Sequence, residues 1–396
     1  MDRLRIGVIG VGSVVREIYQ HLYYHSDFSH LLDVVAVADT NAPALGWFCD
    51  TFGIPPERRF EDYREMLGRV ALDVAQVNTP DHLHAAPAVA ALEAGLDVVV
   101  PKPTAATVKD AHAMIRAART AGRLLGVDFH KREDPRIKEA EARYQSGRYG
   151  QLQSTVWYML DKLLVVDPNH RPPFFASPGF AEKNTPVSFL TVHMCDALLK
   201  IVALRPVSAR AVGFRQKLPS LTPIPVAGYD LVDTEICLAN GAVAHIIAGW
   251  HLPNTAHAAT VQSSRLICTD GMLDIGIDAP GLHELHPDGI FEVNPLFRNF
   301  ERDGTVTGYG ISSPGRLYQK ILASRRGELP AAVRESLLTP AALGFHTTLV
   351  LQAAEESLRL GRESAPGVVS GPVLDLGELV VRELGTAAAA EYGYGG

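Results

Sequence analysis

Short apolar runs alternate with segments of helical periodicity over the first 130 residues of the chain. Between the runs, residues 82–94 and 104–121 place apolar side chains at the spacing of one helical face. Apolar strands joined by amphipathic helices are typical of a parallel sheet that helices cover on both faces. Residues 1–130 are therefore predicted to form a doubly wound domain, with strands within residues 4–10, 32–39, 73–80, 97–103 and 124–130.

The pattern changes after residue 130, so residues 131–396 are assigned to a second, α+β domain. We expect a helix over residues 134–146, followed by a long irregular segment rich in proline and aromatic residues. The next helix is expected to begin near Asn184 or Thr185, because either side chain can accept hydrogen bonds from unpaired amides at a helix start.

Alternating apolar and polar runs between about residues 206 and 310 are separated by Gly, Asn and Asp. This alternation predicts a large, open, mainly antiparallel sheet. A last helix is expected near residues 340–360, and the Ala- and Gly-rich tail after it is not assigned a structure.

The overall composition fits two globular domains and excludes some classes of partner. The chain has 396 residues, of which 47% are hydrophobic and 20% are charged. Its 37 basic residues are scattered and are outnumbered by 44 acidic residues, which gives a net charge of -7. We therefore expect no nucleic-acid partner and no membrane partner.

The cysteine spacing and the N-terminal sequence predict a cytoplasmic protein. The four cysteines lie far apart without a CxxC pair, which argues against a disulfide framework and against a thiolate metal site. The N-terminal "MDRLRIGVIG" enters a strand pattern directly, unlike a signal peptide. No apolar run approaches the roughly 18 residues that a membrane-spanning helix needs.

The stretch "GVIGVGSVV" lies between the first predicted strand and the helix that follows it. Glycines at such a turn let the backbone approach a pyrophosphate, which the N-terminus of the helix favours. The match to GxGxxG is partial, because Val15 occupies the third glycine position, and an ordinary glycine-rich turn is the alternative. The residues predicted to contact a dinucleotide here are Gly10, Val11, Gly12, Ser13 and Val14.

Asp39 ends the second predicted strand and is followed by Thr40 and Asn41. A carboxylate at this position can accept hydrogen bonds from the adenosine ribose hydroxyls and repels a 2'-phosphate. Since no arginine follows it, Asp39 with Thr40 predicts NAD as the cofactor and makes NADP less favoured. The alternative is an aspartate that only caps a helix.

The stretch "VNTPDHLH" comes at the end of another predicted strand. Ligands bind at the carboxyl ends of strands in an open parallel sheet, so we expect Thr79, Pro80, His82 and His84 to border the cofactor. Alternatively, Asp81 caps a helix and the histidines lie on the surface. No third ligand follows the two histidines at a usual spacing, so we predict no metal site.

Lys102 lies between Pro101 and Pro103 at the end of the predicted strand "DVVVP". The prolines fix their own backbone angles, and Pro103 restricts Lys102 to extended geometry, so the direction of the lysine is limited. Such rigidity suits a cation aimed at a ligand. It also suits a strand that ends in a proline-rich turn with its lysine in water.

The stretch "FLTVHMCDALLK" places His193, Asp196 and Lys200 on one stripe of an otherwise apolar helix. The stripe can be structural, with the histidine satisfied by Asp196. If it faces Lys102, a neutral imidazole would serve as a general base.

Together these motifs resemble those of the glucose-fructose oxidoreductase/inositol dehydrogenase (Gfo/Idh/MocA) family. The glycine turn, the acidic strand end, "NTPDHLH", the Lys-Pro strand end, "HKREDP" and the His-x-x-Asp helix occur in the order and spacing of that family. The resemblance covers nearly the whole chain and implies a Rossmann domain followed by the α+β domain. It also implies a homodimer or a homotetramer.

Three positions depart from the family pattern. Pro101 replaces the glutamate of the usual Glu-Lys-Pro, and Phe189 replaces the aspartate one turn before the histidine. In addition, Thr191 replaces a glycine of the same histidine motif. With no carboxylate at position 189, the histidine must be oriented by another group, for which Asp196, Asp161 and Lys183 are the candidates.

The resemblance implies an NAD-dependent dehydrogenase that acts on a sugar, glycoside, amino sugar or cyclitol. Lys102 matches the lysine that contacts the nicotinamide ribose and the substrate hydroxyl, and His193 resembles the catalytic base. Sugar sites place polar groups beside aromatic faces. The candidate substrate contacts, besides Lys102 and His193, are Tyr158, Asp161, His170, Arg171, Lys183 and Asp196.

Two alternative functions are compatible with the same residues. One is a glycoside hydrolase that oxidises a sugar carbon transiently and holds its NAD tightly. The other is a sugar- or dinucleotide-sensing protein that has lost catalysis, which Phe189 favours and the pair Lys102 and His193 opposes.

Overall fold

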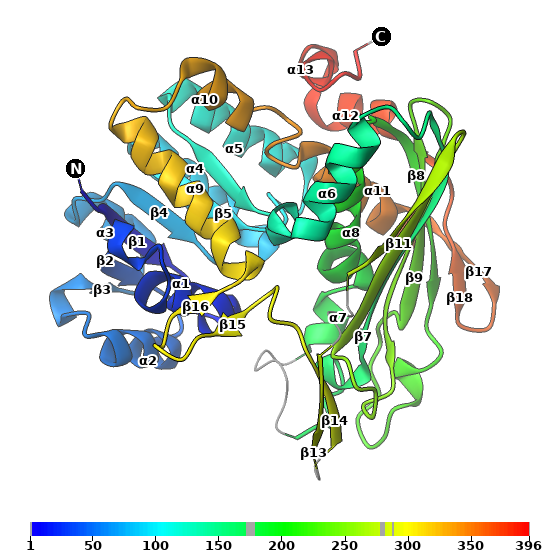
Figure 1. Ribbon diagram of the computed structural model, residues 1–396, viewed down its shortest axis with the longest axis horizontal. Helices are drawn as coiled ribbons and strands as arrows, with labels where there is room; N and C mark the ends of the chain where they lie inside the picture. The colour runs from blue at the N-terminus through cyan, green and yellow to red at the C-terminus, as the bar shows by residue number, and fades with distance from the viewer. Residues whose placement is uncertain (1, 172–178, 278–281, 287–288, 396) are drawn as a thin grey trace. The chain divides into compact units, whose positions relative to one another are not determined.

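The computed structural model describes residues 2–171, 179–277, 282–286 and 289–395, which form two compact units (Figure 1). The first unit comprises Met1–Asp134 and Leu296–Phe345, and the second comprises Pro135–Pro295 and His346–Gly396. The sequence analysis placed residues 296–345 in the second domain, whereas this division assigns them to the first unit.

The first unit is built on six parallel strands in the order β3-β2-β1-β4-β5-β6. The strand order reverses on either side of β1, as in a doubly wound Rossmann sheet, so the predicted fold of this unit is confirmed. The strands are β1 (Leu4–Ile9), β2 (Leu32–Ala38), β3 (Arg59–Phe60), β4 (Val74–Val77), β5 (Asp97–Pro101) and β6 (Leu125–Asp128).

Helices connect these strands and cover the sheet. Helix α5 shows why the sequence folds in this way, since Thr107 accepts a hydrogen bond from the Asp110 amide (3.1 Å) at its start and Gly122 adopts a φ of 60° at its end. The helical segments that follow β1 to β6 are η1 (Val15–Tyr19), α1 (Gln20–His25), η2 (Ser29–Leu31), α2 (Ala42–Phe52), η3 (Pro56–Arg58), α3 (Tyr63–Arg69), η4 (Asp81–Leu83), α4 (Ala85–Glu93), α5 (Val108–Ala121) and η5 (His130–Glu133).

Residues 296–345 belong to the first unit because their main helix, α9, packs on its sheet. A Cβ atom at Gly126 of β6 would lie only 3.1 Å from the Leu317 side chain of α9, so glycine permits this close approach. Tyr318 and Ile321 of the same helix are fully or almost fully buried. The elements of this segment are β15 (Asn299–Phe300), β16 (Val306–Thr307), α9 (Tyr309–Arg325) and α10 (Ala331–Leu337).

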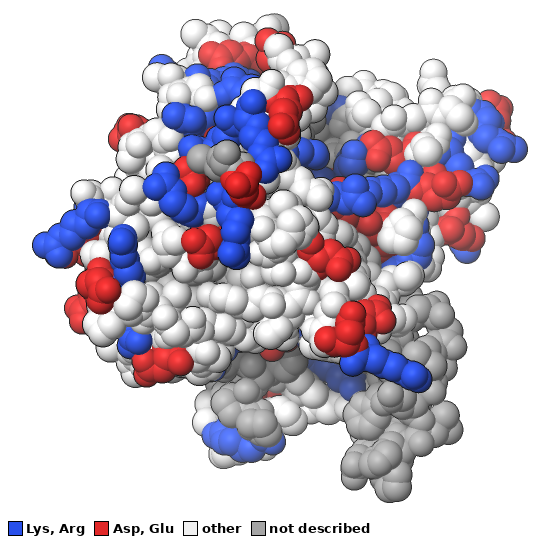
Figure 2. Space-filling model, turned by 60° about the vertical axis from the view of Figure 1, so that its left-hand side comes forward, with Lys and Arg blue, Asp and Glu red and all other residues white. Residues whose placement is uncertain are grey.

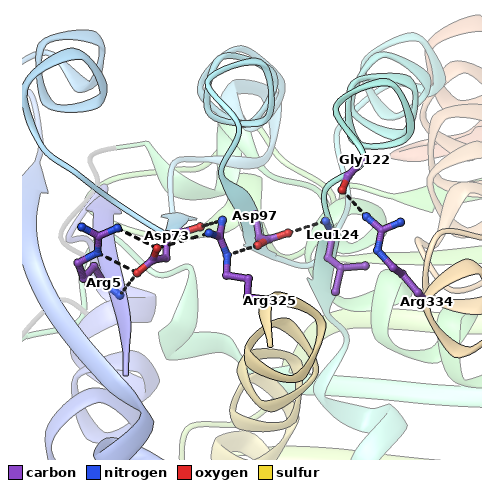
Figure 3. Close-up of polar contacts among 7 residues, drawn as sticks. All are labelled: Arg5, Asp73, Asp97, Gly122, Leu124, Arg325 and Arg334. Atoms are coloured by element: carbon purple, nitrogen blue, oxygen red, sulfur yellow. Dashed lines mark hydrogen bonds and ion pairs between the residues drawn. The ribbon is translucent and has the colours of Figure 1, made fainter. Parts of the chain in front are cut away.

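A buried charge network joins the end of α9 to the amino ends of the strands (Figure 3). Arg325 donates to Asp97 (2.6 Å) and to Asp73 (3.4 Å), and Arg5 donates to Asp73 (3.0 Å). The side chains of Asp73 and Asp97 are only 2% and 3% exposed. Burial alone would raise the pKa of Asp73, but hydrogen bonds from Arg5 and the charges of Arg5 and Arg325 hold it below its usual value.

Replacing Arg325 with methionine is expected to lower the free energy of unfolding by about 3–5 kcal/mol. The substitution would leave two carboxylates buried without their shared cation, which costs far more than the loss of an exposed pair. Urea denaturation monitored by circular dichroism measures the change. Arg326→Met is the matched control, because the Arg326 pair with Glu328 spans 4.0 Å and is more exposed, so its loss should cost under about 1 kcal/mol.

The second unit contains a large open sheet in the order β12-β11-β7-β10-β9-β8-β18-β17, with β19 paired to β8. Its pairs are antiparallel except for β7 with β10, which is parallel, so the predicted mainly antiparallel sheet is confirmed. Its strands are β7 (Leu152–Lys162), β8 (Pro206–Phe214), β9 (Leu231–Leu238), β10 (Val243–Leu252), β11 (Thr260–Cys268), β12 (Gly271–Gly276), β17 (Arg362–Ala365), β18 (Val368–Ser370) and β19 (Leu374–Asp375).

Helices pack on one face of this sheet, and the side chains of the strands alternate accordingly. On β7, Trp157 is 0% exposed whereas its neighbour Tyr158 is 39% exposed. A separate hairpin pairs β13 (Leu282–His286) with β14 (Gly289–Val293). The helical segments are α6 (Pro135–Gln145), η6 (Leu163–Val165), α7 (Phe180–Lys183), η7 (Val187–Thr191), α8 (Val192–Val202), η8 (Leu218–Ser220), α11 (Phe345–Leu360), α12 (Leu376–Leu384) and α13 (Thr386–Glu391).

The C-terminal tail, to which no structure was assigned from the sequence, forms α12 and α13. Asp375 accepts a hydrogen bond from the Glu378 amide (2.9 Å) and so caps α12. Leu376, Leu379 and Val380 are buried on one side of that helix. The apolar spacing before the alanine run therefore outweighs the low complexity of the tail.

Charged side chains of both signs lie close together on the surface. Figure 2 shows Lys and Arg side chains gathered on part of one face, with Asp and Glu beside them. Arg69, for example, pairs with Glu65 at 3.6 Å. Within the described residues, every helix is too short or too polar to cross a lipid bilayer.

Candidate active site

The glycine turn after β1 leaves open space at the start of a helix. Gly10 has a φ of 87°, and a Cβ atom there would lie 3.0 Å from the backbone of Asn78, so both its conformation and its packing require glycine. A Cβ atom at Gly12 would meet nothing within 4 Å. Gly12 and Ser13 are exposed, whereas Val15 is fully buried and continues into the π-helical turn η1. The exposed turn has the geometry that an anion needs at a helix N-terminus.

Asp39 is held against this turn. Its Oδ2 atom accepts a hydrogen bond from the Val11 amide (2.7 Å), and its Oδ1 atom accepts one from the Asn41 amide (2.7 Å). Each carboxylate oxygen can accept a further hydrogen bond. Asp39 is partly exposed and Thr40 is exposed. The remaining lone pairs of the Asp39 carboxylate can therefore accept hydrogen bonds from the hydroxyls of a ribose.

A buried hydrogen-bond chain fixes the other side of the glycine turn. The Asn78 amide donates to the Gly10 carbonyl (3.3 Å), Gln76 donates to Asn78 (2.7 Å), and the Tyr318 hydroxyl donates to Gln76 (2.7 Å). Sequence analysis missed this chain, because Tyr318 lies on α9, 242 residues from Gln76. No local motif predicts such a contact.

The residues after β4 divide into exposed and buried groups. Thr79 lies at the carboxyl end of the strand, and its buried hydroxyl has no hydrogen-bond partner among the described residues. Pro80 is exposed, and the His82 side chain is 66% exposed beside Asp81. The Thr79 hydroxyl is therefore a donor that a bound ligand would satisfy.

His84 does not present its ring to a ligand, contrary to the sequence-based expectation. It is 1% exposed, its Nε2 atom lies 2.9 Å from the Thr79 carbonyl, and its Nδ1 atom lies 3.1 Å from the Pro103 carbonyl. Burial lowers the pKa of His84 in spite of these carbonyls. The ring therefore joins the loops after β4 and β5 from inside the protein.

Lys102 follows β5 at the same edge of the sheet, next to residues that the sequence analysis did not assign. Its peptide bond to Pro103 is cis, and its side chain is partly exposed. Burial, together with the charges of Lys131 and Lys102, lowers the pKa of His130 well below its usual value. His130 begins η5 two residues after β6, and the rule that ligands bind at strand ends could have indicated it.

Asp128 ends β6 and is 3% exposed. Its carboxyl accepts hydrogen bonds from Ser313 (2.6 Å) and Tyr19 (2.9 Å), which come from α9 and η1. Burial nevertheless raises the pKa of Asp128 to about 6. The carboxyl group therefore joins β6, α9 and η1, and it ionises in the folded protein only above mildly acidic pH.

Asp128→Asn is expected to remove one pH-dependent part of the stability. A carboxyl whose pKa rises from about 4 in the unfolded chain to about 6 in the fold stabilises the fold fully below pH 4. This stabilisation, roughly 2–3 kcal/mol, is lost as the pH rises through 6. Urea denaturation between pH 4 and 8 should show this fall in the wild type and a flatter profile in the variant. Parallel profiles for the two proteins would exclude Asp128 as the titrating group.

In the second unit, His193 lies on α8, directly after the π-helical turn η7. His193 is 8% exposed and Asp196 is 2% exposed, and the Thr347 hydroxyl donates to Asp196 (3.4 Å). The Thr185 hydroxyl accepts hydrogen bonds from the Val187 and Ser188 amides (3.1 and 3.3 Å), so Thr185 caps the helical segment that begins at Pro186 and continues into η7. This cap fixes where the helix begins and hence the face on which His193 lies.

The predicted substrate residues on β7 point to opposite faces of the sheet. Asp161 shares the helix-covered face with Trp157 and Met159, whereas Tyr158 lies on the other face, in a shallow hollow with Ser263 and Arg265. Side chains three residues apart on a regular strand cannot share a face. Tyr158 and Asp161 therefore do not lie on one face of β7, and only Asp161 shares the face that the helices cover.

The remaining predicted residues lie outside the sheet. Arg171 is exposed, and its guanidinium donates to the carbonyls of Pro168 (2.6 Å) and His170 (2.7 Å) in its own turn. Lys183 is exposed at the end of α7. Lys200 pairs with Glu141 of α6 at 2.8 Å, so the polar stripe of α8 ends in a structural ion pair.

The described residues fit a dinucleotide in the first unit. The open space at Gly12, the unpaired Thr79 hydroxyl and the partly exposed Asp39 carboxylate all follow carboxyl ends of neighbouring strands. In the described parts of the chain, no three His, Cys, Asp or Glu side chains group closely enough to hold a metal ion.

Residues 4–129 match the sequence model of the Gfo/Idh/MocA family, described as an oxidoreductase family with an NAD-binding Rossmann fold. The matched residues make up about a third of the chain. The first unit accordingly contains an NAD-binding Rossmann domain over residues 4–129, and the family resemblance drawn from the motifs is confirmed over these residues.

Curated relatives of this chain include sugar and cyclitol dehydrogenases. The D-glucoside 3-dehydrogenase of Escherichia coli is 27% identical over 206 residues, which are 50% of this chain and 54% of the relative. The inositol 2-dehydrogenase of Salmonella typhimurium is 28% identical over 149 residues, 37% of this chain and 43% of the relative. The matches thus span about half of the relatives' length or less.

The fold extends beyond the Rossmann domain. The structure is similar, with a TM-score of 0.70 and 18% identity, to an inositol dehydrogenase homologue from Azotobacter vinelandii solved with NADH and myo-inositol. This similarity covers 94% of the chain and 98% of that structure. Both units therefore follow the fold seen in that protein.

Proposed function

We propose that the protein is an NAD-dependent dehydrogenase that oxidises a hydroxyl-bearing carbon of a sugar, glycoside, amino sugar or cyclitol. The observation that carries this proposal is Lys102, which directly follows β5 at the edge of the NAD-binding sheet where the glycine turn, Asp39 and Thr79 follow β1, β2 and β4. The named activities of the curated relatives, D-glucoside and inositol dehydrogenation, support the substrate class.

Lys102 and His193 have separate roles in this proposal. Oxidation of a secondary alcohol releases a hydride from carbon and a proton from the hydroxyl group. NAD supplies the acceptor for the hydride when it is bound. His193 takes the hydroxyl proton as general base, and the ammonium of Lys102 stabilises the negative charge that develops on the oxygen.

Asp39 and the glycine turn select and hold the cofactor. The Asp39 carboxylate accepts hydrogen bonds from the ribose hydroxyls and repels a 2'-phosphate, so NAD is preferred to NADP. The Thr79 hydroxyl, which no described residue satisfies, provides a further hydrogen bond. Asp196, on the same helix as His193, and Asp161, on β7, are candidates to orient the imidazole or to bind substrate hydroxyls.

The test is NADH formation by the purified protein with a panel of aldoses, inositols, amino sugars and glycosides, each with NAD and with NADP. Sustained NADH formation with at least one class, and weaker activity with NADP, is expected. Hydrolysis of a glycoside by a tightly held cofactor, without net NADH, would instead establish the hydrolase alternative. Sugar binding without either reaction would establish a sensor.

A further inference from the structure

Three aromatic rings meet on the helix-covered face of the sheet in the second unit. One of them, Phe189, lies one turn before His193. The ring centroids of Phe189 and Phe180 are 5.2 Å apart in an edge-to-face arrangement, and those of Phe189 and Trp250 are 5.6 Å apart. Trp250 is 1% exposed, whereas Phe180 and Phe189 are partly exposed. The cluster therefore has a buried base and an accessible rim made by two phenylalanines.

Helix geometry places the Phe189 ring on the same face as the His193 imidazole. The two residues are four positions apart, and the chain between them passes from the π-helical turn η7 into α8. Four residues make slightly more than one α-helical turn and slightly less than one π-helical turn. Phe189 and His193 are therefore stacked along one face across this junction.

A carboxylate lies at the border of the same cluster. Trp250 is on β10, next to Gly249, which pairs with Leu160 of β7, and Asp161 follows Leu160 on the helix-covered face. The site thus combines an aromatic surface, a carboxylate and an imidazole. A saccharide ring has this dual chemistry, with apolar C–H faces and polar hydroxyl edges.

We propose that Phe189, with Phe180 and Trp250 behind it, selects glycosides that carry an apolar aglycone over free, fully hydroxylated sugars. This proposal rests on the dehydrogenase function above. A hydroxyl group pressed against these rings would lose its water without gaining a hydrogen-bond partner, whereas an alkyl or aryl group would gain contact area. The rings therefore favour the substituted substrate and disfavour the free one.

The test compares phenyl β-D-glucopyranoside with D-glucose in two measurements on the full chain. Titration calorimetry of the protein saturated with NADH gives the ratio of their dissociation constants without turnover. NADH formation from NAD gives the ratio of their kcat/KM values. In the wild type both ratios should favour the phenyl glycoside by about tenfold or more, consistent with an aromatic pair.

Phe189→Leu keeps an apolar side chain but removes the ring, so the preference in both ratios should fall about five- to tenfold. Phe189→Tyr restores a ring and should keep the preference. The matched control is Phe214→Leu, on the open face of the same sheet, which should leave both ratios unchanged. An unchanged binding ratio in Phe189→Leu, or no preference in the wild type, would overturn the proposal. If the binding preference is present but no NADH forms, the proposed dehydrogenase function is wrong and the selectivity of the aromatic cluster still holds.

Discussion

Lys102→Met is expected to lower kcat for sugar oxidation by about 10²- to 10³-fold. Methionine matches the length of the lysine stem but has no charge, so the alkoxide that develops on the substrate oxygen loses its cation. Removal of one such electrostatic donor from an enzyme site costs about this much in kcat. Steady-state NADH formation at saturating NAD measures the effect.

The Lys102→Met substitution should lower kcat without affecting folding and with little effect on cofactor binding. Lys102 is partly exposed at a strand end, so its removal leaves the buried sheet intact. NAD affinity, measured by calorimetry, should fall by less than about tenfold, because the Asp39 and glycine-turn contacts remain. Lys109→Met is the matched control, since Lys109 is exposed on α5 of the same unit and should be inactive in catalysis. A Lys102→Met protein with wild-type kcat would refute the assigned role.

His193→Ala is expected to lower kcat by about 10²- to 10⁴-fold, because the hydroxyl proton then has no positioned acceptor. Added imidazole should restore part of the activity if the cavity left by the substitution admits it. This rescue separates loss of a base from loss of structure, since a misfolded site would not respond to imidazole.

The control for His193 is His245→Ala on the opposite face of the sheet. His245 lies 3.3 Å from Asp233 on that face, so its loss should leave kcat unchanged. NAD binding should be unaffected in both variants, because the cofactor contacts lie in the first unit. Near-normal turnover in His193→Ala would remove this residue from the mechanism.

The doubly wound domain could be predicted because the signals for its strands and turns come from residues that are neighbours in the sequence. Buried parallel strands are continuous apolar runs, and the glycine turn and Asp39 follow two of these runs directly. The sequence analysis did not name β7 as a strand, although "STVWYML" has the β-branched and aromatic composition of one. Without that strand, the opposite orientations of Tyr158 and Asp161 could not be foreseen.

The role of residues 296–345 could not be predicted, because it depends on contacts distant in sequence. Helix α9 contributes Arg325 to the buried carboxylates, Tyr318 to the glycine turn and Ser313 to Asp128. Each contact joins residues at least 185 positions apart. Amphipathic spacing indicates that a helix packs somewhere, but it does not indicate on which sheet.

Within the candidate site, sequence reasoning identified polar residues more reliably than their orientation. Lys102, Asp39 and Thr79 lie at strand ends, as expected from the rule for open parallel sheets. His84 follows the same strand but turns inward to backbone carbonyls. A histidine in a motif can thus serve to join two loops, and only the three-dimensional contacts reveal this role.

The most direct test of the account is a crystal structure of the protein with NADH and an oxidisable glycoside. We expect a dinucleotide against the turn from Gly10 to Gly12. We also expect Lys102 Nζ and an imidazole nitrogen of His193 both within about 3.2 Å of one substrate oxygen. Nitrogens that face different cavities, or a dinucleotide bound away from this turn, would contradict it.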